Sequence, residues 1–572
     1  MENGKKKYKG IWKSFFHMLY ESGLPYGKLA VTLVLNIIIA WLGLLMPDMI
    51  SGLVTDVSEV LLKSIFEVGI ASICFGMVAV VTKYLAWYGI DRNMQRLAVR
   101  KIFYLKMDDV GKQDPRELVT RVTTDTKLLS ELLVTIAVDE GPRLYFMIAA
   151  LIKIFKNYNT TLGFVMLLSI PVTFFISWIV GVFTFGKADV AQTAISKLTA
   201  RIGEKVNNMS IIKSYNNQEY EAESGDEVIK DLEHALKKKA FITRIGEGMK
   251  VVSTLIPTTT VIVIGAAMVL SGKVETASFV AYYSLAGTFI GYVVAHLPLW
   301  VLVKNSQGAT YRLSKILELP DERVTENRQG KTGNIEFCDV TKKFEDHVVL
   351  DHVSFKIEEG NKTAFVGFSG SGKSTALNLI EQFYRPDGGE IRMGGAPVTD
   401  YDLTSYRKLF TYVPQNAPGF SGSVRDILTY GRNSEVSDES LWDALEKTDA
   451  AAFVKLLGGL DYEVGNRAEK LSGGQKQKLS LARAMLSETD IMLLDEATSA
   501  LDIVATEKIQ KVLDAKMKGK TMILVAHNIS TVTNADKIIV FDEGKVLAEG
   551  THETLLNTCS LYKELAMLQK EA

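Results

Sequence analysis

Long apolar segments constrain this chain more than any other feature of its sequence, and all of them lie before residue 305. A helix that crosses a bilayer needs about 20 consecutive, mostly apolar residues. Segments of this kind occupy residues 29–49, 68–90, 133–158, 162–183, 251–270 and 279–303. We therefore predict six transmembrane helices.

The segments between these spans indicate an orientation in the membrane. The gaps after the second and fourth spans are long, rich in Lys and Arg and helical in pattern, and residues 1–22 are also basic. Basic segments stay on the cytoplasmic side, so an even number of spans places the C-terminal half there too. Residues 1–22 lack the apolar core of a cleaved signal peptide and predict a helix on the membrane surface.

The net charge and the cysteine content argue against a nucleic-acid-binding protein and against a disulfide-rich one. The 65 basic and 66 acidic residues leave a formal net charge of −1, so no long-range field indicates a nucleic-acid partner. The three cysteines are scattered and form no CxxC pattern, so we expect no disulfide framework. Charged residues still make up 23% of the chain, which predicts a soluble part beside the apolar one.

The composition of the sequence changes from mostly apolar to polar after residue 317. Residues 318–333 are polar, contain Pro and Gly, and predict a linker. Beyond them, short β-rich runs alternate with helical stretches, the pattern of an α/β nucleotide-binding domain. The predicted domains are an N-terminal surface helix (1–22), a six-helix transmembrane domain (23–317), the linker (318–333) and a P-loop domain (334–572).

The second half of the sequence contains a phosphate-binding loop. Residues 367–374 read GFSGSGKS and match GxxxxGK[ST] between an apolar strand and a helix. In such loops, glycines let backbone N–H groups approach phosphate oxygens, the lysine reaches the β- and γ-phosphates, and the hydroxyl ligates Mg²⁺. We expect ATP to contact Gly367, Ser369, Gly370, Ser371, Gly372, Lys373, Ser374 and Thr375.

Two acids end a second apolar strand, in the sequence IMLLDEATSALD. Asp495 is placed to hold Mg²⁺, and Glu496 is placed to polarise the attacking water. Either acid alone would be an ordinary strand end. Together with the phosphate-binding loop, they predict an ATP hydrolase that works by positioning and charge neutralisation.

The pentapeptide LSGGQ at 471–475 resembles the signature motif of the ABC transporter superfamily. The resemblance extends over nearly the whole chain and implies a half-transporter of the type IV exporter fold, with fused membrane and nucleotide-binding domains. It implies that Ser472, Gly473, Gly474 and Gln475 contact the ATP held by the opposite subunit. The ATP site then needs a second half-transporter, either another copy or a different chain.

Other motifs of the family follow in order. The resemblance implies that Phe344 stacks on adenine, where Tyr is usual, and that Gln415 senses Mg²⁺ and water. It implies that Asp502 communicates between the two ATP sites and that His527 contacts the γ-phosphate. Glu496, His527 and Gln415 are thus the expected catalytic group, and Ser374, Gln415 and Asp495 the expected Mg²⁺ ligands.

Two segments of the membrane half resemble the intracellular loops of exporters. Residues 111–125 resemble the first loop, in which a short helix docks on the nucleotide-binding domain, and residues 211–219 resemble the second. These segments favour an exporter over importers whose membrane and ATPase subunits are separate chains.

The resemblance implies ATP-driven transport by alternating access. We expect export of a small amphipathic molecule, drug, lipid or peptide. Two alternatives stay open: import of metal–siderophore complexes on the same fold, and an ATP-gated channel or regulator. The expected location is the inner or plasma membrane of a bacterial cell, as a multi-pass protein in the lipid bilayer with its N-terminus and nucleotide-binding domain in the cytoplasm.

Charged residues near the spans suggest where cargo binds. Glu140, Arg143, Glu247 and His296 lie in or beside apolar segments, where ionisable side chains usually face a cavity or a partner. One hypothesis is a polar, inward-facing substrate cavity lined by these four residues. The alternative is a set of internal salt bridges.

Overall fold

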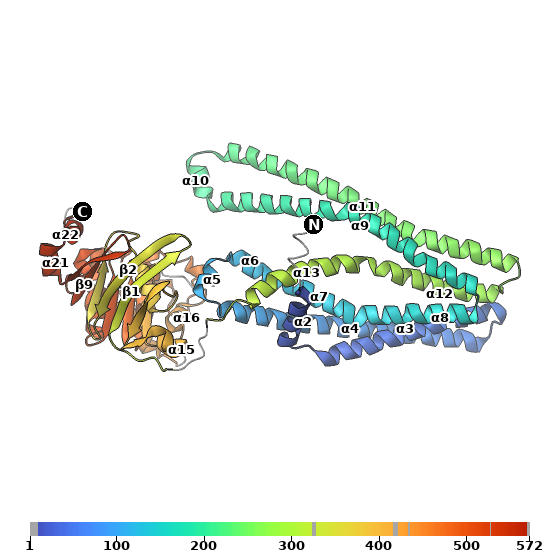
Figure 1. The fold of residues 1–572 in the computed structure, drawn as a ribbon, viewed down its shortest axis with the longest axis horizontal. Helices are drawn as coiled ribbons and strands as arrows, with labels where there is room; N and C mark the ends of the chain where they lie inside the picture. The colour runs from blue at the N-terminus through green and yellow to red at the C-terminus, as the bar shows by residue number, and fades with distance from the viewer. Residues whose placement is uncertain (1–9, 323–327, 416–420, 433–434, 527, 569–572) are drawn as a thin grey trace. The chain divides into compact units, whose positions relative to one another are not determined.

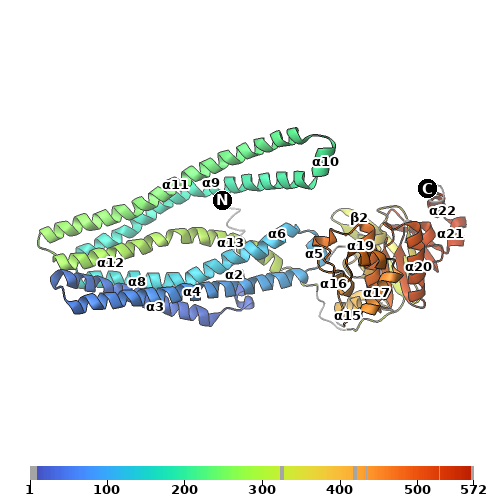
Figure 2. The same cartoon turned by 180° about the vertical axis from the view of Figure 1, so that it is seen from behind.

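The computed structural model describes residues 10–322, 328–415, 421–432, 435–526 and 528–568. The chain divides into two compact units. The first comprises the residues up to Phe103 together with Asp114–Leu319, and the second comprises Tyr104–Gln113 together with the residues from Pro320 onward. Each unit can be followed in the ribbons of Figures 1 and 2 and is described by itself.

The first unit consists of helices. They are α2 (Ile11–Ser22), α3 (Tyr26–Thr55), α4 (Glu59–Phe103), α6 (Pro115–Thr120), η1 (Arg121–Asp125), α7 (Thr126–Val134), η2 (Thr135–Glu140), α8 (Gly141–Asn157), α9 (Thr160–Asn207), α10 (Met209–Ser214), α11 (Gln218–Leu270), α12 (Thr276–Ala295) and α13 (Leu297–Leu317). The two longest, α9 and α11, run side by side and are joined by α10 (Figures 1 and 2).

All six predicted apolar segments are helical. Among the described residues, four helical stretches are long and apolar enough to cross a membrane: Tyr26–Thr55, Glu59–Phe103, Gln218–Leu270 and Thr276–Leu317. The apolar part of α9 is described only over Thr160–Ile176. The third predicted span differs from the others, because it consists of α7, the π-helical η2 and the 17-residue α8.

The interruption of the third span has a local cause. Pro142 lies in the first turn of α8 and has no N–H to donate to the carbonyl of Val138, four residues earlier. Asn36 of α3 supplies the missing donor, from its Nδ2 to the Val138 oxygen at 2.8 Å. A side chain of another helix therefore satisfies a backbone group that the proline leaves free.

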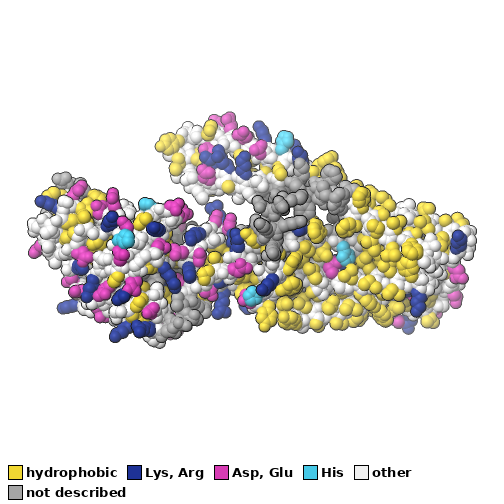
Figure 3. All heavy atoms as spheres, viewed as in Figure 1, with side chains coloured by type: hydrophobic (Ala, Val, Ile, Leu, Met, Phe, Trp, Pro, Cys, Tyr) yellow, Lys and Arg dark blue, Asp and Glu magenta, His cyan; other side chains and the backbone are white. Residues whose placement is uncertain are grey.

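The surface of the first unit is apolar over much of its length. Figure 3 shows hydrophobic side chains gathered over α3, α8 and α12, whereas charged side chains are scattered over the second unit. Val60, Met77 and Phe174 are each at least two-thirds exposed. Apolar exposure on this scale fits a lipid-facing surface rather than one in water.

The second unit is built on two sheets. Its strands are β1 (Ile335–Phe344), β2 (His347–Ile357), β3 (Lys362–Val366), β4 (Gly388–Met393), β5 (Ala396–Pro397), β6 (Phe410–Val413), β7 (Ile491–Asp495), β8 (Thr521–Val525), β9 (Lys537–Asp542) and β10 (Lys545–Gly550). Among the described residues, an antiparallel sheet has the order β2-β1-β4-β5, and a larger sheet has the order β10-β9-β3-β8-β7-β6. Strands β9, β3, β8, β7 and β6 of the larger sheet are parallel.

Helices cover the larger sheet and form a separate lobe. They are α5 (Met107–Gly111), α14 (Lys373–Ile380), η3 (Val398–Asp400), α15 (Leu403–Arg407), α16 (Val424–Thr429), α17 (Asp438–Lys447), α18 (Ala451–Leu457), η4 (Asn466–Ala468), α19 (Gly473–Leu486), α20 (Ile503–Lys516), η5 (Ile529–Thr531), α21 (His552–Thr558) and α22 (Ser560–Leu568). Buried apolar residues of α16, α17, α18 and α19 form a core of their own.

Parallel strands with both faces covered explain the apolar runs of the sequence. Every residue of β7 and β8 is buried, as expected for strands inside a parallel sheet. Between the two sheets, Phe355 stacks on Phe337 at 4.2 Å between ring centroids and meets Phe365 and Phe541 edge-on. Because β3, β8, β7 and β6 are parallel and adjacent in this order, their carboxyl ends lie side by side at one edge of the larger sheet.

A short segment from the first half of the sequence belongs to the second unit. The backbone N–H of Glu322 donates to the oxygen of Tyr104 at 2.7 Å, and Arg407 holds the Glu322 carboxylate with two hydrogen bonds. The segment predicted to dock on the nucleotide-binding domain was 111–125, whereas the structure assigns Tyr104–Gln113, with α5, to this unit.

Candidate functional site

The loop after β3 depends on glycine at two positions. Gly367 and Gly372 have φ values of 152° and 100°, in the region that side-chain-bearing residues rarely adopt. A Cβ on Gly367 would lie 2.1 Å from the oxygen of Phe541, and one on Gly372 would lie 2.5 Å from Leu350 Cδ2. The backbone can therefore follow this tight path into α14 only with glycine at both positions.

Lys373 is held inside the loop. Its side chain is buried, and Nζ donates to the oxygens of Gly367 at 2.9 Å and Phe368 at 2.7 Å. Burial lowers the pKa of Lys373, while the nearby carboxylates of Glu496 and Asp495 oppose this shift. The ammonium thus lies within the loop at the N-terminus of α14.

Asp495 ends β7 opposite the loop. The hydroxyl of Ser374 donates to its Oδ1 at 2.9 Å, and the Tyr412 hydroxyl lies 3.5 Å from its Oδ2. Burial raises the pKa of Asp495, and the adjacent Glu496 charge adds to this effect. A buried carboxylate beside a hydroxyl is an oxygen pair suited to Mg²⁺, because a cation would relieve the cost of burying the charge.

Glu496 follows Asp495 in an unusual backbone conformation. Its φ is 49°, a left-handed value that is uncommon for residues other than glycine. Its N–H donates to the oxygen of Val525 on β8, and its side chain accepts a hydrogen bond of 2.6 Å from Gln415. The ends of β7 and β6 thus bring together the two residues predicted to handle the attacking water.

The signature residues cap a helix. Ser472 is the N-cap of α19, where its hydroxyl accepts from the Gln475 N–H while Gln475 Oε1 accepts from the Ser472 N–H. Gly473 opens the helix, and Gly474 packs against the oxygen of Ala500, 3.0 Å from where a Cβ would lie. This leaves an exposed helix N-terminus, a site that favours an anion.

Two further predicted residues have defined positions in the second unit. Asp502 is the N-cap of α20 and accepts from the Ala505 N–H at 2.8 Å. Phe344 ends β1 and meets Tyr384 edge-on at 5.0 Å, while Lys342 Nζ lies 5.3 Å from the Phe344 ring centroid. A cavity of 550 Å³ opens beside this ring, lined by Asp108, Lys112, Thr341–Glu345, Asp387 and Gly388.

Gln477 is a residue that the sequence interpretation missed. It is buried, its Nε2 donates to the oxygen of Glu496 at 3.2 Å, and its Oε1 accepts from the Ala500 N–H at 3.0 Å. It therefore ties α19 to the segment that carries Glu496. Helical periodicity could have revealed it, because Gln477 shares the buried face of α19 with Leu481 and Ala484.

Other predicted residues are placed as follows. Ser371 is buried and Ser369 is exposed within the phosphate-binding loop, Gly370 has a φ of 83°, and Thr375 lies in the first turn of α14. His527 lies outside the described residues. It follows β8, the strand between β3 and β7.

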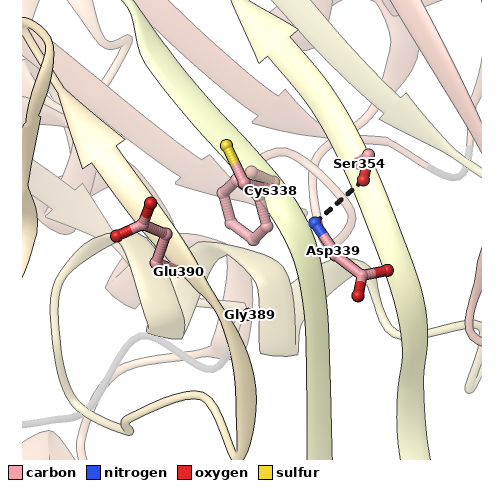
Figure 4. A pocket seen from close by; sticks show the side chains of 6 residues that line it. Cys338, Asp339, Ser354, Gly389 and Glu390 are labelled. Atoms are coloured by element: carbon pink, nitrogen blue, oxygen red, sulfur yellow. Dashed lines mark hydrogen bonds between the residues drawn. The ribbon is translucent and has the colours of Figure 1, made fainter.

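A shallow, open pocket lies on the antiparallel sheet (Figure 4). Its volume is 750 Å³, and it is lined by Phe337, Cys338, Asp339, Ser354, Gly389 and Glu390. It forms at a bulge of β1, where the Asp339 N–H donates to Ser354 Oγ. None of its lining residues is among those predicted to bind ATP.

In the first unit, three of the four residues predicted to line a substrate cavity lie together. Arg143 Nη1 donates to Glu140 Oε1 at 2.6 Å, and His296 Nε2 lies 2.6 Å from Glu140 Oε2. Glu247 is elsewhere, on the exposed surface of α11, where it accepts from Arg244. The three clustered residues are paired internally, the arrangement expected under the salt-bridge alternative.

Comparison with known families extends over both units. The model described as "ABC transporter transmembrane region" matches residues 27–293, and the model described as "ABC transporter" matches residues 350–499. The second match contains the phosphate-binding loop, Gln415, the signature and both strand-end acids.

Two curated relatives illustrate matches that extend over nearly the whole of both chains. An ATP-dependent lipid A-core flippase of Idiomarina loihiensis is 31% identical over 91% of this chain and 90% of its own. A multidrug resistance ABC transporter ATP-binding and permease protein of Lactococcus lactis is 25% identical over 98% of this chain and 96% of its own. The structure of a bacterial Atm1-family ABC exporter with ATP bound superposes with a TM-score of 0.83 at 20% identity, covering 95% of this chain and 98% of that one.

Proposed function

This chain belongs to the ABC transporter family, and on that premise we propose that it uses ATP hydrolysis to export a small amphipathic molecule, drug, lipid or peptide by alternating access. The observation that carries the proposal is the convergence of Lys373, Asp495 and Glu496 at the carboxyl ends of β3 and β7. Ligands of parallel α/β sheets bind at this edge.

The residues of the site have different roles in phosphoryl transfer. The N–H groups of the loop and Lys373 hold the β- and γ-phosphates, and Phe344 stacks on adenine. Glu496, oriented by the amide of Gln415, accepts a hydrogen bond from the attacking water. By the same resemblance, His527 contacts the γ-phosphate, and Asp502 relays the state of one site to the other.

Mg²⁺ fits the oxygen groups present. Ser374 and Asp495 already lie within hydrogen-bond distance, and Gln415 offers a further oxygen nearby. Bound there, Mg²⁺ would neutralise negative charge on the phosphate oxygens. Burial raises the pKa of Asp495 because a buried negative charge is costly, and a bound cation would reduce that cost.

We propose that a second half-transporter completes each ATP site. The helix cap formed by Ser472 and Gln475 is exposed at the N-terminus of α19 and has donors suited to a γ-phosphate. In a head-to-tail pair of nucleotide-binding domains, this cap faces the phosphate-binding loop of the partner. The partner is another copy of this chain or a different half-transporter.

The names of the relatives support an amphipathic or lipidic cargo. The flippase acts on lipid A-core and the lactococcal relative confers multidrug resistance, as their names state. The chain is a multi-pass membrane protein. We propose that it lies in the inner or plasma membrane of a bacterial cell, with its N-terminus and second unit in the cytoplasm.

Sealed vesicles test the direction of transport. Candidate drugs and fluorescent lipids are presented to inside-out vesicles, whose nucleotide-binding domains face the outer solution. ATP-dependent accumulation inside supports export. Uptake of a metal–siderophore complex by right-side-out vesicles with ATP sealed inside would instead establish import, and a current without accumulation would indicate a channel.

A further inference from the structure

Arg407, the last residue of α15, links two separate segments of the second unit. Its Nε donates to the oxygen of Glu381 at 3.1 Å, and its Nη2 donates to the oxygen of Gln382 at 3.1 Å. Nη1 and Nη2 also donate to the two carboxylate oxygens of Glu322, at 3.0 and 2.6 Å. The planar guanidinium has five N–H donors, so it can bind both carbonyls and the carboxylate at once.

The two carbonyls lie at the end of α14, the helix that begins with Lys373 of the phosphate-binding loop. Carbonyls at the end of a helix have no intrahelical donor, and a cation there also interacts favourably with the helix dipole. The hydroxyl of Tyr406 adds a hydrogen bond of 2.7 Å to the oxygen of Ile380. Two adjacent residues of α15 therefore hold the end of α14 that lies opposite the phosphate-binding loop.

Glu322 carries this contact to two places where the chain passes between the units. Its N–H donates to the oxygen of Tyr104 at 2.7 Å, and an antiparallel bridge joins Leu105 to Asp321. The chain enters the second unit at Tyr104, directly after α4, and enters it again one residue before Asp321, after α13. Arg407 therefore attaches both of these crossings to the end of α14.

The pair between Arg407 and Glu322 is partly shielded from solvent. The two side chains are 28% and 20% exposed, and the guanidinium lies over the ring of Phe383, with its Cζ 5.0 Å from the ring centroid. A bidentate pair in such surroundings is screened less by salt than a surface pair, and its two parallel hydrogen bonds give it a defined orientation. The contacts therefore favour one arrangement of α14, α15 and the two crossings.

We propose that Arg407 is a positioning residue that transmits the nucleotide state of α14 to the membrane unit through Glu322 and the two chain crossings. When ATP binds at the start of α14, Arg407 carries the resulting shift of this helix to the segments that follow α4 and α13. The inference rests on the proposed function, because the link acts only if ATP drives a conformational change of the first unit.

Hydrogen–deuterium exchange of the full chain in lipid nanodiscs tests the link. Exchange is measured by mass spectrometry without nucleotide and with Mg²⁺ and AMP-PNP, a non-hydrolysable ATP analogue. Peptides over residues 366–380 report nucleotide binding, and peptides over residues 208–217, between α9 and α11, report the response of the first unit. In the wild type we expect AMP-PNP to change the exchange of both regions.

Two variants break the link from its two sides. Arg407→Met keeps an apolar stem but removes every donor, whereas Glu322→Ala leaves the contacts of Arg407 with α14 in place. We expect both variants to keep the effect of AMP-PNP on the nucleotide-binding peptides and to lose its effect on the first-unit peptides. Arg392→Met, which changes an exposed arginine of β4 paired with Glu390, is the control and should respond like the wild type in both regions.

The outcomes separate this inference from the proposed function. A first-unit response of wild-type size in either Arg407→Met or Glu322→Ala would overturn the link alone. A wild-type chain whose first unit does not respond to AMP-PNP would contradict ATP-driven alternating access, and this inference with it.

The KM for ATP supplies a second check on the assigned role. Glu322→Ala should keep the wild-type KM, because the change leaves α14 and the phosphate-binding loop intact. A raised KM would place Glu322 in nucleotide binding itself and would overturn its role as a link.

Discussion

Gln415 Nε2 donates a hydrogen bond of 2.6 Å to Glu496 Oε2, although the two residues are 81 positions apart in the sequence. The bond joins the loop after β6 to the end of β7. The Glu496 carboxylate is therefore held by a residue outside its own motif.

Glu496→Gln should abolish hydrolysis while preserving ATP binding. The amide has the same shape as the carboxylate but cannot accept a proton from water, so we expect the turnover rate to fall by about 10²–10³-fold. ATPase rates and binding of a fluorescent ATP analogue measure the two effects separately. A variant that hydrolyses ATP at the wild-type rate would rule out the role assigned to Glu496.

Gln477→Leu should destabilise the second unit. The change leaves the Ala500 N–H without its acceptor and removes one of the hydrogen bonds to the Glu496 backbone oxygen, at a cost of about 1–3 kcal/mol in free energy of unfolding. Thermal unfolding and the ATPase rate should both decline. Gln510→Leu on α20, whose amide contacts Asp514 one turn away, is the matched control and should change stability far less.

The stability of the second unit should depend on the protonation of Glu381. Burial raises the pKa of Glu381 from 4.5 to about 7, partly opposed by Arg407. The folded state holds this proton more tightly than the unfolded chain, so the stabilisation is complete below pH 4.5 and is lost as the pH rises through 7.

Glu381→Gln removes this dependence, and we expect it to raise the free energy of unfolding at pH 8 by on the order of 1–3 kcal/mol. Chemical denaturation of wild type and variant at pH 5.5 and pH 8 measures the difference. Equal stability of the two proteins at both pH values would show that Glu381 is solvated in the native state.

Lys342→Met should weaken ATP binding more than it slows turnover. The buried ammonium lies 5.3 Å from the ring centroid of Phe344 and 5.8 Å from that of Tyr384, and it donates to the oxygen of Arg385, so it helps to fix the ring predicted to stack on adenine. We expect KM for ATP to rise several-fold, about 1 kcal/mol of lost binding, with kcat little changed. A fall in kcat at unchanged KM would place the effect elsewhere.

The local motifs made the ATP site predictable from sequence. Gly367, Lys373 and Ser374 lie in one contiguous loop, and Asp495 and Glu496 are adjacent at the end of one strand. Strand-ending motifs of a parallel sheet meet at one edge, so their proximity followed from the fold class alone. The apolar segments likewise predicted helices, since their length reflects the thickness of a bilayer.

Contacts between distant residues could not be predicted in the same way. Glu140 and His296 were both proposed as cavity residues, but one sequence gives no indication that their side chains meet across 156 positions (296 − 140). The hydrogen bond from Asn36 of α3 to Val138 of the π-helical η2 likewise joins residues far apart in the sequence. The burial of Lys342, in a strand position flanked by polar residues, depends on Tyr384 and Asp387, which follow α14.

Mixing two inactive variants tests most directly whether two chains build each ATP site head to tail. Lys373→Ala disables the phosphate-binding loop, and Ser472→Arg blocks the signature helix. Each variant alone should lose ATPase activity, because every site in its dimer contains one damaged half.

A purified mixed dimer carrying one chain of each kind should regain activity, since it has one site with an intact loop and an intact signature. Differently tagged copies allow this dimer to be isolated, and the wild-type dimer sets the scale. We predict that the mixed dimer hydrolyses ATP well above either variant alone. A mixed dimer as inactive as its parents would contradict the shared site.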